Sequence, residues 1–344
     1  MRIFVTGGTG FVGSRFQQLL TARRIETVIY DLLAPRSDRS VEYIRGDVRD
    51  QKKLTAAMSG CDAVLHLAAA HHDFGIATQT FHDVNVQGMN NVCAAMQANG
   101  INDLCFYSTV AVYGDQPAPI DEATTPAPIS DYGKTKWAAE LVCQKWVADN
   151  LKAHCLVIRP TVIFGPQHFA NMYALIRQID RRRFVRVGNM QNIKSLAYID
   201  NIVNATIELW IDRPANTPRY QCLNYVDKPD LTSRQIMDAV YQGLGRKPGV
   251  LFVPYSLARL LVVPFDIVIG LTGKNLPISS ARIKKLTVAH TQYEADKIHK
   301  LVDSPPVPLA QGIENMVQWY LSEGKQAVPL NRRPPANCQI SSAV

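Results

Sequence analysis

Short apolar runs and amphipathic stretches alternate from residue 2 to residue 165, and this alternation limits the fold more than any other feature of the chain. Helical patterns cover 13–24, 85–100 and 132–150. The apolar runs that they separate are predicted strands at 2–7, 27–32, 41–47, 63–69, 103–109 and 154–160. Strands that alternate with helices are typical of a parallel sheet with helices on both faces. We therefore expect an α/β fold with a doubly wound parallel sheet.

The regular alternation of strand and helix patterns becomes less clear after residue 165. A strand-like run at 195–200 lies among helical patterns at 171–182, 232–245 and 312–324. We expect these segments to form a smaller C-terminal α/β lobe at one edge of the sheet. The last residues contain Pro, Asn and Ser without periodicity, which is typical of disorder. The predicted division is a first domain at 1–165, a second lobe at 166–323 and a disordered tail at 324–344.

The charge balance narrows the range of partners. The 344 residues include 37 Lys and Arg against 29 Asp and Glu, which gives a formal net charge of +8. This excess fits an anionic ligand, whereas nucleic-acid binding is not expected, because the sequence has no long basic block with interleaved aromatic residues. The densest cationic run, Arg181–Arg183 with Arg186, is interpreted as a solvated helix end.

Cysteine usage and apolar segments bear on the compartment. The seven cysteines are scattered and odd in number, which favours buried free thiols in a reducing cytoplasm. No secretory signal pattern precedes the first strand. The most apolar segment, 250–271, contains Arg259, Asp266 and two prolines, so a spanning helix is not expected. A buried or partly exposed helical pair is favoured there over adsorption to a membrane surface.

The stretch TGGTGFVG, from Thr6 to Gly13, places four glycines in eight residues between the first strand and the first helix. Gly7 permits a tight turn, Gly10 lets backbone N–H groups approach a diphosphate, and Gly13 lets the helix pack closely on the strand. Phe11 and Val12, which are predicted cofactor contacts together with the three glycines, begin the helix, whose N-terminus carries partial positive charge. The pattern predicts a dinucleotide site in a Rossmann-type domain at 1–165.

Asp31 ends the second predicted strand, 18 residues beyond Gly13. A carboxylate at this place accepts hydrogen bonds from the adenosine ribose hydroxyls and repels a 2′-phosphate. NAD is therefore the predicted cofactor. NADP is the less favoured one, because Arg36 is near enough in the sequence to tolerate the phosphate.

Tyr132 and Lys136 are spaced i, i+4 in a helical pattern, so they share one face of a helix. A tyrosine with a pKa of about 10 is a weak base at neutral pH. The nearby ammonium, together with a cationic nicotinamide, is expected to lower this pKa and to make the phenolate a proton acceptor. Thr109 ends the fifth predicted strand and is the predicted holder of the substrate oxygen, with Ser108 as the alternative.

These motifs carry a family resemblance. With GDVRD at 46–50, HLAAA at 66–70, YSTVAVYG at 107–114 and YGKTK at 132–136, the chain resembles the extended short-chain dehydrogenase/reductases of the NAD-dependent epimerase/dehydratase family. The resemblance covers about residues 1–320 and implies a dimer formed through a four-helix contact that includes the Tyr132 helix. The further cofactor contacts that it implies are Asp47, Val48, Leu67, Ala68, Ala69, Asn85 and Pro160.

The second lobe resembles the nucleotide-sugar branch of this family. The resemblance implies that Lys194 holds a substrate diphosphate where Arg is usual, with Asn171 and Arg282 as further contacts. Val162 departs from the branch, since many sugar epimerases have Asn there. Val110 and Ala111 replace the Asp-Glu pair that dehydratases place after the catalytic Thr, which argues against 4,6-dehydration.

The predicted function is NAD-dependent epimerisation by reversible hydride transfer at C4 of a UDP-hexose or UDP-N-acetylhexosamine, without a metal ion. A nucleotide 4-keto-sugar reductase would use the same residues. A 3β-hydroxysteroid-type dehydrogenase is the third alternative, and the apolar segment 250–271 favours it. A non-catalytic dinucleotide sensor is the alternative from another class, although such a protein has no need to keep both Tyr132 and Lys136.

Overall fold

The computed structural model of the chain describes residues 1–35, 41–71, 76–248, 252–272, 291–303, 306–328 and 335. Arg36 and Arg282 lie outside the described residues, as does most of the predicted tail. Within that tail, the carbonyl of Pro335 accepts a hydrogen bond from Arg49 Nη2 at 3.0 Å.

The centre of the molecule is a seven-stranded sheet in the order β10-β6-β5-β4-β1-β2-β3, and every neighbouring pair is parallel. The strand order reverses between β1 and β4, which makes the carboxyl ends of these two strands the place where ligands bind in such sheets. The strands are β1 (Arg2–Thr6), β2 (Glu26–Asp31), β3 (Glu42–Arg45), β4 (Ala63–His66), β5 (Asp103–Tyr107), β6 (His154–Pro160) and β10 (Tyr220–Tyr225).

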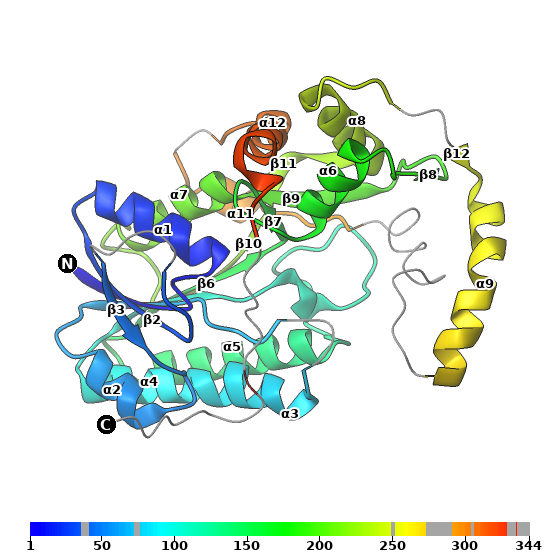
Figure 1. The fold of residues 1–344 in the computed structure, drawn as a ribbon. Helices are drawn as coiled ribbons and strands as arrows, with labels where there is room; N and C mark the ends of the chain where they lie inside the picture. The colour runs from blue at the N-terminus through cyan, green and yellow to red at the C-terminus, as the bar shows by residue number, and fades with distance from the viewer. Residues whose placement is uncertain are drawn as a thin grey trace.

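Helices cover both faces of this sheet (Figure 1). One face carries α1 (Phe11–Ala22) and α7 (Ile199–Trp210). The opposite face carries α2 (Gln51–Ala57), α4 (Gly88–Ala98) and α5 (Asp131–Asp149), with the short α3 (Thr78–Phe81) and η1 (His82–Gln87) before α4. Strand residues alternate between two apolar cores, since Ile3 and Val5 face one and Phe4 faces the other. The doubly wound Rossmann-type fold that the sequence predicts is confirmed.

The smaller lobe is built around a three-stranded sheet in the order β11-β9-β7. A two-stranded sheet of β12 and β8 lies beyond it (Figure 1). The strand β10 belongs to residues 166–323 but pairs with β6 in the main sheet, so this part of the chain contributes to both sheets. The strands are β7 (Val162–Phe164), β8 (Arg186–Val187), β9 (Ile193–Tyr198), β11 (Asp227–Thr232) and β12 (Phe252–Val253).

The remaining helices complete the smaller lobe, apart from the short η2 (Val110–Tyr113), which follows β5. They are α6 (Asn171–Asp180), α8 (Ser233–Gly243), α9 (Tyr255–Thr272), α11 (Asp296–His299), α12 (Leu309–Trp319) and η3 (Tyr320–Gly324). Among the residues that the structure describes, no helix is long and apolar enough to cross a membrane. The described cysteines are free thiols, and all of them except Cys222 are buried.

Candidate active site

The glycine loop and the end of β4 meet at the point where the strand order reverses. Gly7 follows β1 with a φ of +68°, and a Cβ added there would lie 2.7 Å from the backbone nitrogen of Ala68. A side chain at this position would therefore collide with the segment Leu67–Ala69. This close approach is the reason why the loop requires glycine at Gly7.

The next glycines set the start of α1. Gly10 is the N-cap residue, and Ser14 N donates to its carbonyl at 2.9 Å. A Cβ on Gly13 would lie 2.6 Å from the Cα of Gly8, so only glycine lets the first turn of the helix pack on the loop. Phe11 stacks on His168, with ring centroids 4.2 Å apart. The N-terminus of α1 thus begins at the carboxyl end of β1, as a diphosphate site requires.

A buried pair of side chains joins β1 to β4 beneath this loop. Thr6 Oγ1 and His66 Nδ1 lie 2.7 Å apart, and Ala68 N donates to the same hydroxyl at 3.3 Å. Burial and, in smaller part, the charge of Lys136 lower the pKa of His66 to about 3. His66 is therefore a neutral strand residue that fixes the ends of the two strands on which the site rests.

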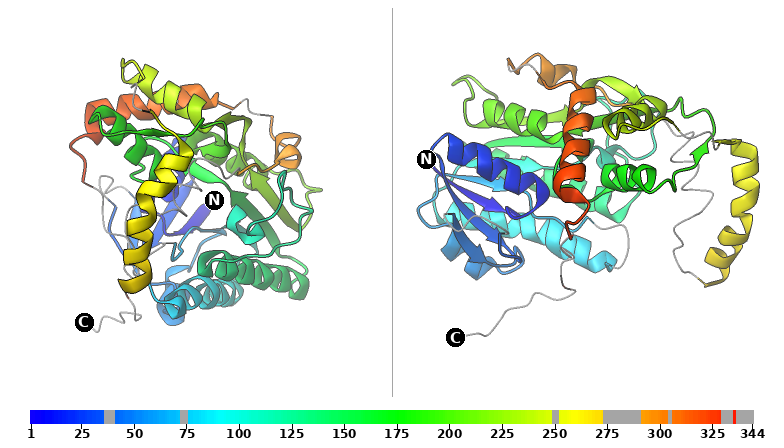
Figure 2. Two further views of the ribbon diagram at one scale, coloured as in Figure 1. Left: turned by 90° about the vertical axis from the view of Figure 1, so that its right-hand side faces the viewer. Right: turned by 45° about the horizontal axis from the view of Figure 1, so that its top comes forward.

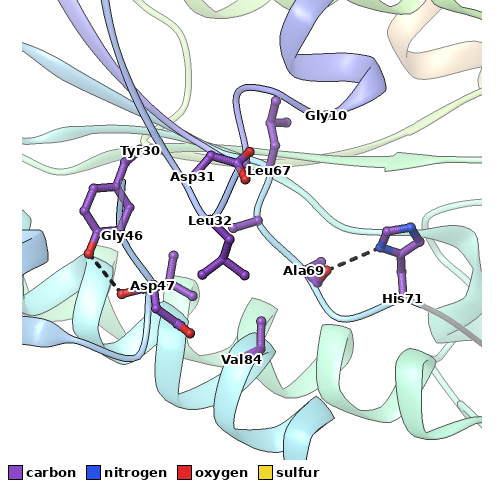
Figure 3. A pocket seen from close by; sticks show the side chains of 13 residues that line it. Gly10, Tyr30, Asp31, Leu32, Gly46, Asp47, Leu67, Ala69, His71 and Val84 are labelled. Carbon is purple, nitrogen blue, oxygen red and sulfur yellow. Dashed lines mark hydrogen bonds between the residues drawn. The ribbon is translucent and has the colours of Figure 1, made fainter. Parts of the chain in front are cut away.

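A pocket opens beside the glycine loop (Figure 3). Asp31 lies in it at the end of β2, where Oδ2 accepts from Thr9 N at 3.1 Å and Oδ1 accepts from Leu33 N at 3.2 Å. These backbone donors fix the carboxylate at the position that the sequence assigns to ribose binding. The other residues lining the pocket are Gly7, Gly10, Tyr30, Leu32, Gly46, Asp47, Val48, Leu67, Ala68, Ala69, His71 and Val84.

Asp47 and Val48 form the floor of this pocket after β3. The Asp47 carboxylate is buried and pairs with Arg49 Nη2 at 2.6 Å, while the Tyr30 hydroxyl donates to the Asp47 carbonyl at 3.0 Å. Val48 is buried and packs in the core on the α4 side of the sheet. The sequence did not predict the role of Arg49, which neutralises Asp47 at the place where the adenine is expected.

Asn85 lies in η1 and uses its amide within the protein. Its Oδ1 accepts from Ala70 N at 2.8 Å, and its Nδ2 donates to Ala70 O at 3.0 Å and to Thr135 Oγ1 at 3.0 Å. Asn85 therefore ties the segment after β4 to α5. Its contact with a cofactor stays a prediction.

Thr109 and Tyr132 come together because α5 begins against the segment after β5. Ser130 caps α5 by accepting from Gly133 N at 3.1 Å, and a Cβ on Gly133 would lie 2.5 Å from the carbonyl oxygen of Ala111. Glycine at 133 thus allows the first turn of α5 to lie on residues 109–113. Burial raises the pKa of Tyr132, and a side-chain interaction with the Thr109 hydroxyl opposes this effect in smaller part, so the two hydroxyl groups are neighbours.

Lys136 lies one turn further along α5 and is only 2% exposed. Its Nζ lies 4.1 Å from the ring centroid of Phe106. Within the described parts of the chain, no hydrogen bond to this ammonium is formed. Burial lowers the pKa of Lys136 to about 7, against a smaller opposite effect of Glu140. A buried amine without a protein acceptor is an orphaned donor that a bound ligand would satisfy.

Burial also raises the pKa of Tyr132, to about 12. The lowered pKa that the sequence predicts for this phenol is therefore wrong for the protein alone. The physical reason is that burial disfavours the phenolate, while Lys136 has itself lost most of its excess proton affinity and carries only part of a positive charge at neutral pH. An additional positive charge is needed before the phenol becomes a base.

A buried ion pair that the sequence did not predict lies behind these residues. Glu140 is fully buried one turn after Lys136 and pairs with Arg159 of β6 at 2.6 Å. The Ser108 hydroxyl donates to the same carboxylate, and Arg159 Nη1 donates to the Tyr113 hydroxyl at 2.8 Å. Ser108 is thereby engaged in the core. This supports Thr109 as the hydroxyl that faces Tyr132.

Comparison with known proteins identifies the family of the chain. The model described as the NAD dependent epimerase/dehydratase family matches residues 3–222. The chain belongs to this family. The resemblance noted in the sequence is thus confirmed.

Alignments with similar proteins cover nearly the whole chain. An N-acetyl-alpha-D-glucosaminyl-diphospho-ditrans,octacis-undecaprenol 4-epimerase of Escherichia coli O157:H7 is 39% identical, with 94% of this chain and 96% of that protein covered. A UDP-glucose 4-epimerase of Vibrio cholerae is 26% identical over 93% of this chain and 95% of its own. The crystal structure of a UDP-glucuronic acid 4-epimerase from Bacillus cereus in complex with NAD superposes with a TM-score of 0.73 at 20% identity, covering 93% and 98% of the two chains.

The site of this member of the epimerase/dehydratase family fits NAD on three observations. The Gly7 backbone leaves no room for a side chain beside Ala68, Asp31 presents a fixed carboxylate in the pocket, and the Lys136 ammonium has no acceptor among the described residues. Each is a feature that a bound dinucleotide would use.

The predicted substrate residues are distributed over the smaller lobe. Asn171 is the first residue of α6 and is exposed, and Lys194 is half-buried in β9. Pro160, a predicted cofactor contact, is buried at the end of β6 in the main sheet. Val162 begins β7 and is 48% exposed. Asn201 of α7 is buried, and its Nδ2 donates to Asp227 Oδ1 at 3.0 Å. The roles of Asn171 and Lys194 stay predictions.

Proposed function

We propose that the protein is an NAD-dependent 4-epimerase of a hexose or N-acetylhexosamine attached to a diphosphate, with a UDP-sugar as the substrate predicted from the sequence. The proposal is supported by the interaction between the Thr109 and Tyr132 hydroxyl groups and by the burial of Lys136 one turn further along α5. Membership of the epimerase/dehydratase family supports it.

In this proposal the residues of the chain divide the work around the sugar C4. NAD, when bound, would supply hydride chemistry at C4 and a cationic ring whose charge favours the Tyr132 phenolate. Tyr132 takes the proton of the C4 hydroxyl, and Thr109 holds the oxygen. Lys136 orients the cofactor ribose and carries charge next to the phenol. After the keto sugar has turned, Tyr132 would return the proton to the C4 oxygen, so that the reaction proceeds without net oxidation.

A lipid-linked diphosphate sugar is the second candidate substrate. The Escherichia coli relative, whose name specifies an undecaprenol diphosphate, is 39% identical, whereas the UDP-glucose 4-epimerase of Vibrio cholerae is 26% identical over a similar length. Both substrate classes carry the sugar on a diphosphate, so Asn171 and Lys194 retain their proposed role in either case.

We also propose a cytoplasmic homodimer formed through α4 and α5. The side chain of Leu141 on α5 is 45% exposed although it is apolar, as expected of a helix that meets a second copy. Burial of this leucine on association is the physical basis of the proposal.

The test is epimerisation without added cofactor. Purified protein is incubated with UDP-N-acetylglucosamine or UDP-glucose, or with the polyprenyl diphosphate of N-acetylglucosamine, and the sugar products are identified by NMR. Tyr132→Phe is expected to slow turnover by about 100-fold or more while bound NAD is retained. Tyr220→Phe is the control, because this phenol contacts Gln144 at 3.3 Å on the β10 side of the sheet.

Other outcomes identify the alternatives. A reductase would change the reduced-nicotinamide absorbance in proportion to an added 4-keto sugar, and a sensor would bind NAD without turnover of any sugar. Full turnover by Tyr132→Phe in an active preparation would show that the proposed proton acceptor is wrong.

A further inference from the structure

The helix α9 lies at the outer edge of the molecule, beyond β8 and β12 (Figure 1; yellow in both panels of Figure 2). Its first half carries large apolar side chains that face solvent. Leu257 is 46%, Leu260 67%, Leu261 59% and Val263 44% exposed. The solvent face of a helix in a soluble protein is normally polar, so a run of this kind needs a covering partner.

The exposed leucines form one surface of the helix. Leu257, Leu260 and Leu261 are spaced i, i+3 and i+4, so they lie side by side. Ala258 and Val262, four residues apart on another face, are buried. Phe252 in β12, three residues before the start of the helix, is also 46% exposed.

Exposed cations lie next to this apolar surface. β12 pairs with β8 in parallel, with Phe252 opposite Arg186, and the Arg186 guanidinium lies 5.0 Å from the Phe252 ring centroid. The chain enters β8 through Arg181–Arg183, and all three of these arginines are exposed. Val185, between them and Arg186, is 42% exposed. Apolar and cationic side chains therefore share one end of the smaller lobe.

We infer that α9, with Phe252 and Val185, docks on the surface of a lipid bilayer, and that Arg181–Arg183 bind its anionic headgroups. Apolar side chains that enter the acyl boundary beside cations that meet phosphates are the chemistry of helices that lie in the membrane interface. Arg259 and Asp266 within the helix favour lying on the membrane over crossing it. The sequence alone favours a buried or partly exposed helical pair here over adsorption to a membrane, and the exposure of the leucines in α9 supports adsorption.

Docking would bring the active site to a substrate that is held in a membrane. This consequence of docking rests on the proposed function, and it makes the lipid-linked diphosphate sugar, not the free nucleotide sugar, the substrate. The docking itself depends only on the side chains at the end of the smaller lobe, so the two parts are separable by experiment.

The test of docking is co-sedimentation of the full chain with vesicles. Vesicles of phosphatidylcholine with phosphatidylglycerol are expected to bind the protein, and phosphatidylcholine alone to bind it at least tenfold less. Leu260→Ser/Leu261→Ser is expected to weaken binding to the anionic vesicles at least tenfold, which corresponds to about 1.4 kcal/mol. Arg181→Gln/Arg182→Gln/Arg183→Gln is expected to abolish the preference for anionic lipid. Leu151→Ser, at a leucine that is 81% exposed after α5, is the matched control and is expected to bind normally.

Three results would overturn the inference. The first is failure of the unaltered protein to bind either vesicle, and the second is unchanged binding by the double leucine variant. The third is that this variant converts a dimer to a monomer without an effect on vesicle binding, which would assign the surface to a second copy. Turnover of the polyprenyl diphosphate of N-acetylglucosamine, dispersed in detergent without vesicles, is measured on the same variants and is expected to be unchanged. Loss of all turnover in the unaltered protein, with vesicle binding intact, would refute the proposed function and not the docking.

Discussion

At the scale of the residue, the candidate site contains an amine whose burial lowers the stability of the folded chain. Lys136 is buried beside the ring of Phe106 and has no hydrogen-bond acceptor among the described residues. Burying an amine in this way disfavours its charged form, and the pKa of Lys136 falls to about 7 as a result. Such a cost is typical of a residue that is retained for binding or catalysis rather than for stability.

This cost predicts a pH-dependent gain of stability when the amine is removed. Below pH 7 the lysine is protonated in both folded and unfolded chains, and the folded chain bears the full cost. Between pH 7 and 10.5 only the unfolded chain holds the proton, so the cost declines as pH rises. Lys136→Met is therefore expected to raise the free energy of unfolding at pH 6 by up to about 5 kcal/mol, with a smaller gain at pH 9, and to lose epimerase activity.

Urea unfolding at the two pH values measures this difference. Lys134→Met is the control, because Lys134 lies two residues away on α5 and is exposed, so no comparable gain is expected. A Lys136→Met protein that is less stable than the unaltered chain at both pH values would contradict the burial argument.

At the scale of the element, the loop between β1 and α1 is determined by contact with the segment after β4. Gly7 and Gly100 have nearly the same backbone angle, with φ of +68° and +70°. A Cβ on Gly7 would meet the backbone of Ala68 at 2.7 Å, whereas a Cβ on Gly100 would meet nothing within 4 Å. Substitutions at the two glycines therefore separate the free-energy cost of the left-handed backbone conformation from the cost of a collision between a Cβ and Ala68.

Gly100→Ala is expected to lower the free energy of unfolding by about 1 kcal/mol and to leave NAD binding unchanged. Gly7→Ala is expected to cost more and to weaken NAD binding at least about tenfold, because the loop must move away from Ala68. Chemical unfolding and NAD titration by calorimetry measure both effects. Equal losses in the two variants would mean that the approach of Gly7 to Ala68 has no part in binding.

The same comparison explains what the sequence predicts well. The glycine loop, the carboxylate after β2 and the Tyr132–Lys136 pair are encoded by local spacing, because strand ends and helix turns fix their relative positions. Glu140 and Arg159 are not encoded in this way: their ion pair depends on how α5 packs on β6, and Glu140 stands among residues with ordinary helical character. Its spacing of four from Lys136 is the one local signal of its place behind the site.

For the segment 250–271, the sequence predicts the helix but does not predict which of its faces is exposed. Its composition predicts helix, and α9 covers Tyr255–Thr272. Whether an apolar helix is buried or exposed depends on what lies opposite each face, and that is set by residues far away in the sequence. The exposed state of Leu260 and Leu261 therefore required the structure.

At the scale of the whole molecule, the two parts of the chain are joined next to the glycine loop. Arg15 of α1 pairs with Asp200 of α7 at 2.7 Å, and α1 begins at Gly10 in the loop that is proposed to hold the diphosphate. A cofactor that orders this loop thus acts on a helix that also contacts the segment following β9. We expect NAD binding to stabilise the molecule as a unit rather than the first domain alone.

This expectation gives a test of cofactor choice in the intact protein. After removal of co-purified nucleotide, NAD at 100 times its dissociation constant is expected to raise the free energy of unfolding by about 2.7 kcal/mol in one transition. NADP at the same concentration is expected to stabilise far less, because the Asp31 carboxylate, fixed by Thr9 N and Leu33 N, would face the 2′-phosphate. Asp31→Asn should narrow the difference, since the amide carries no charge. Calorimetry of the unaltered protein and of Asp31→Asn measures these differences. Equal stabilisation of the unaltered chain by NAD and NADP would show that Asp31 does not select between the two cofactors.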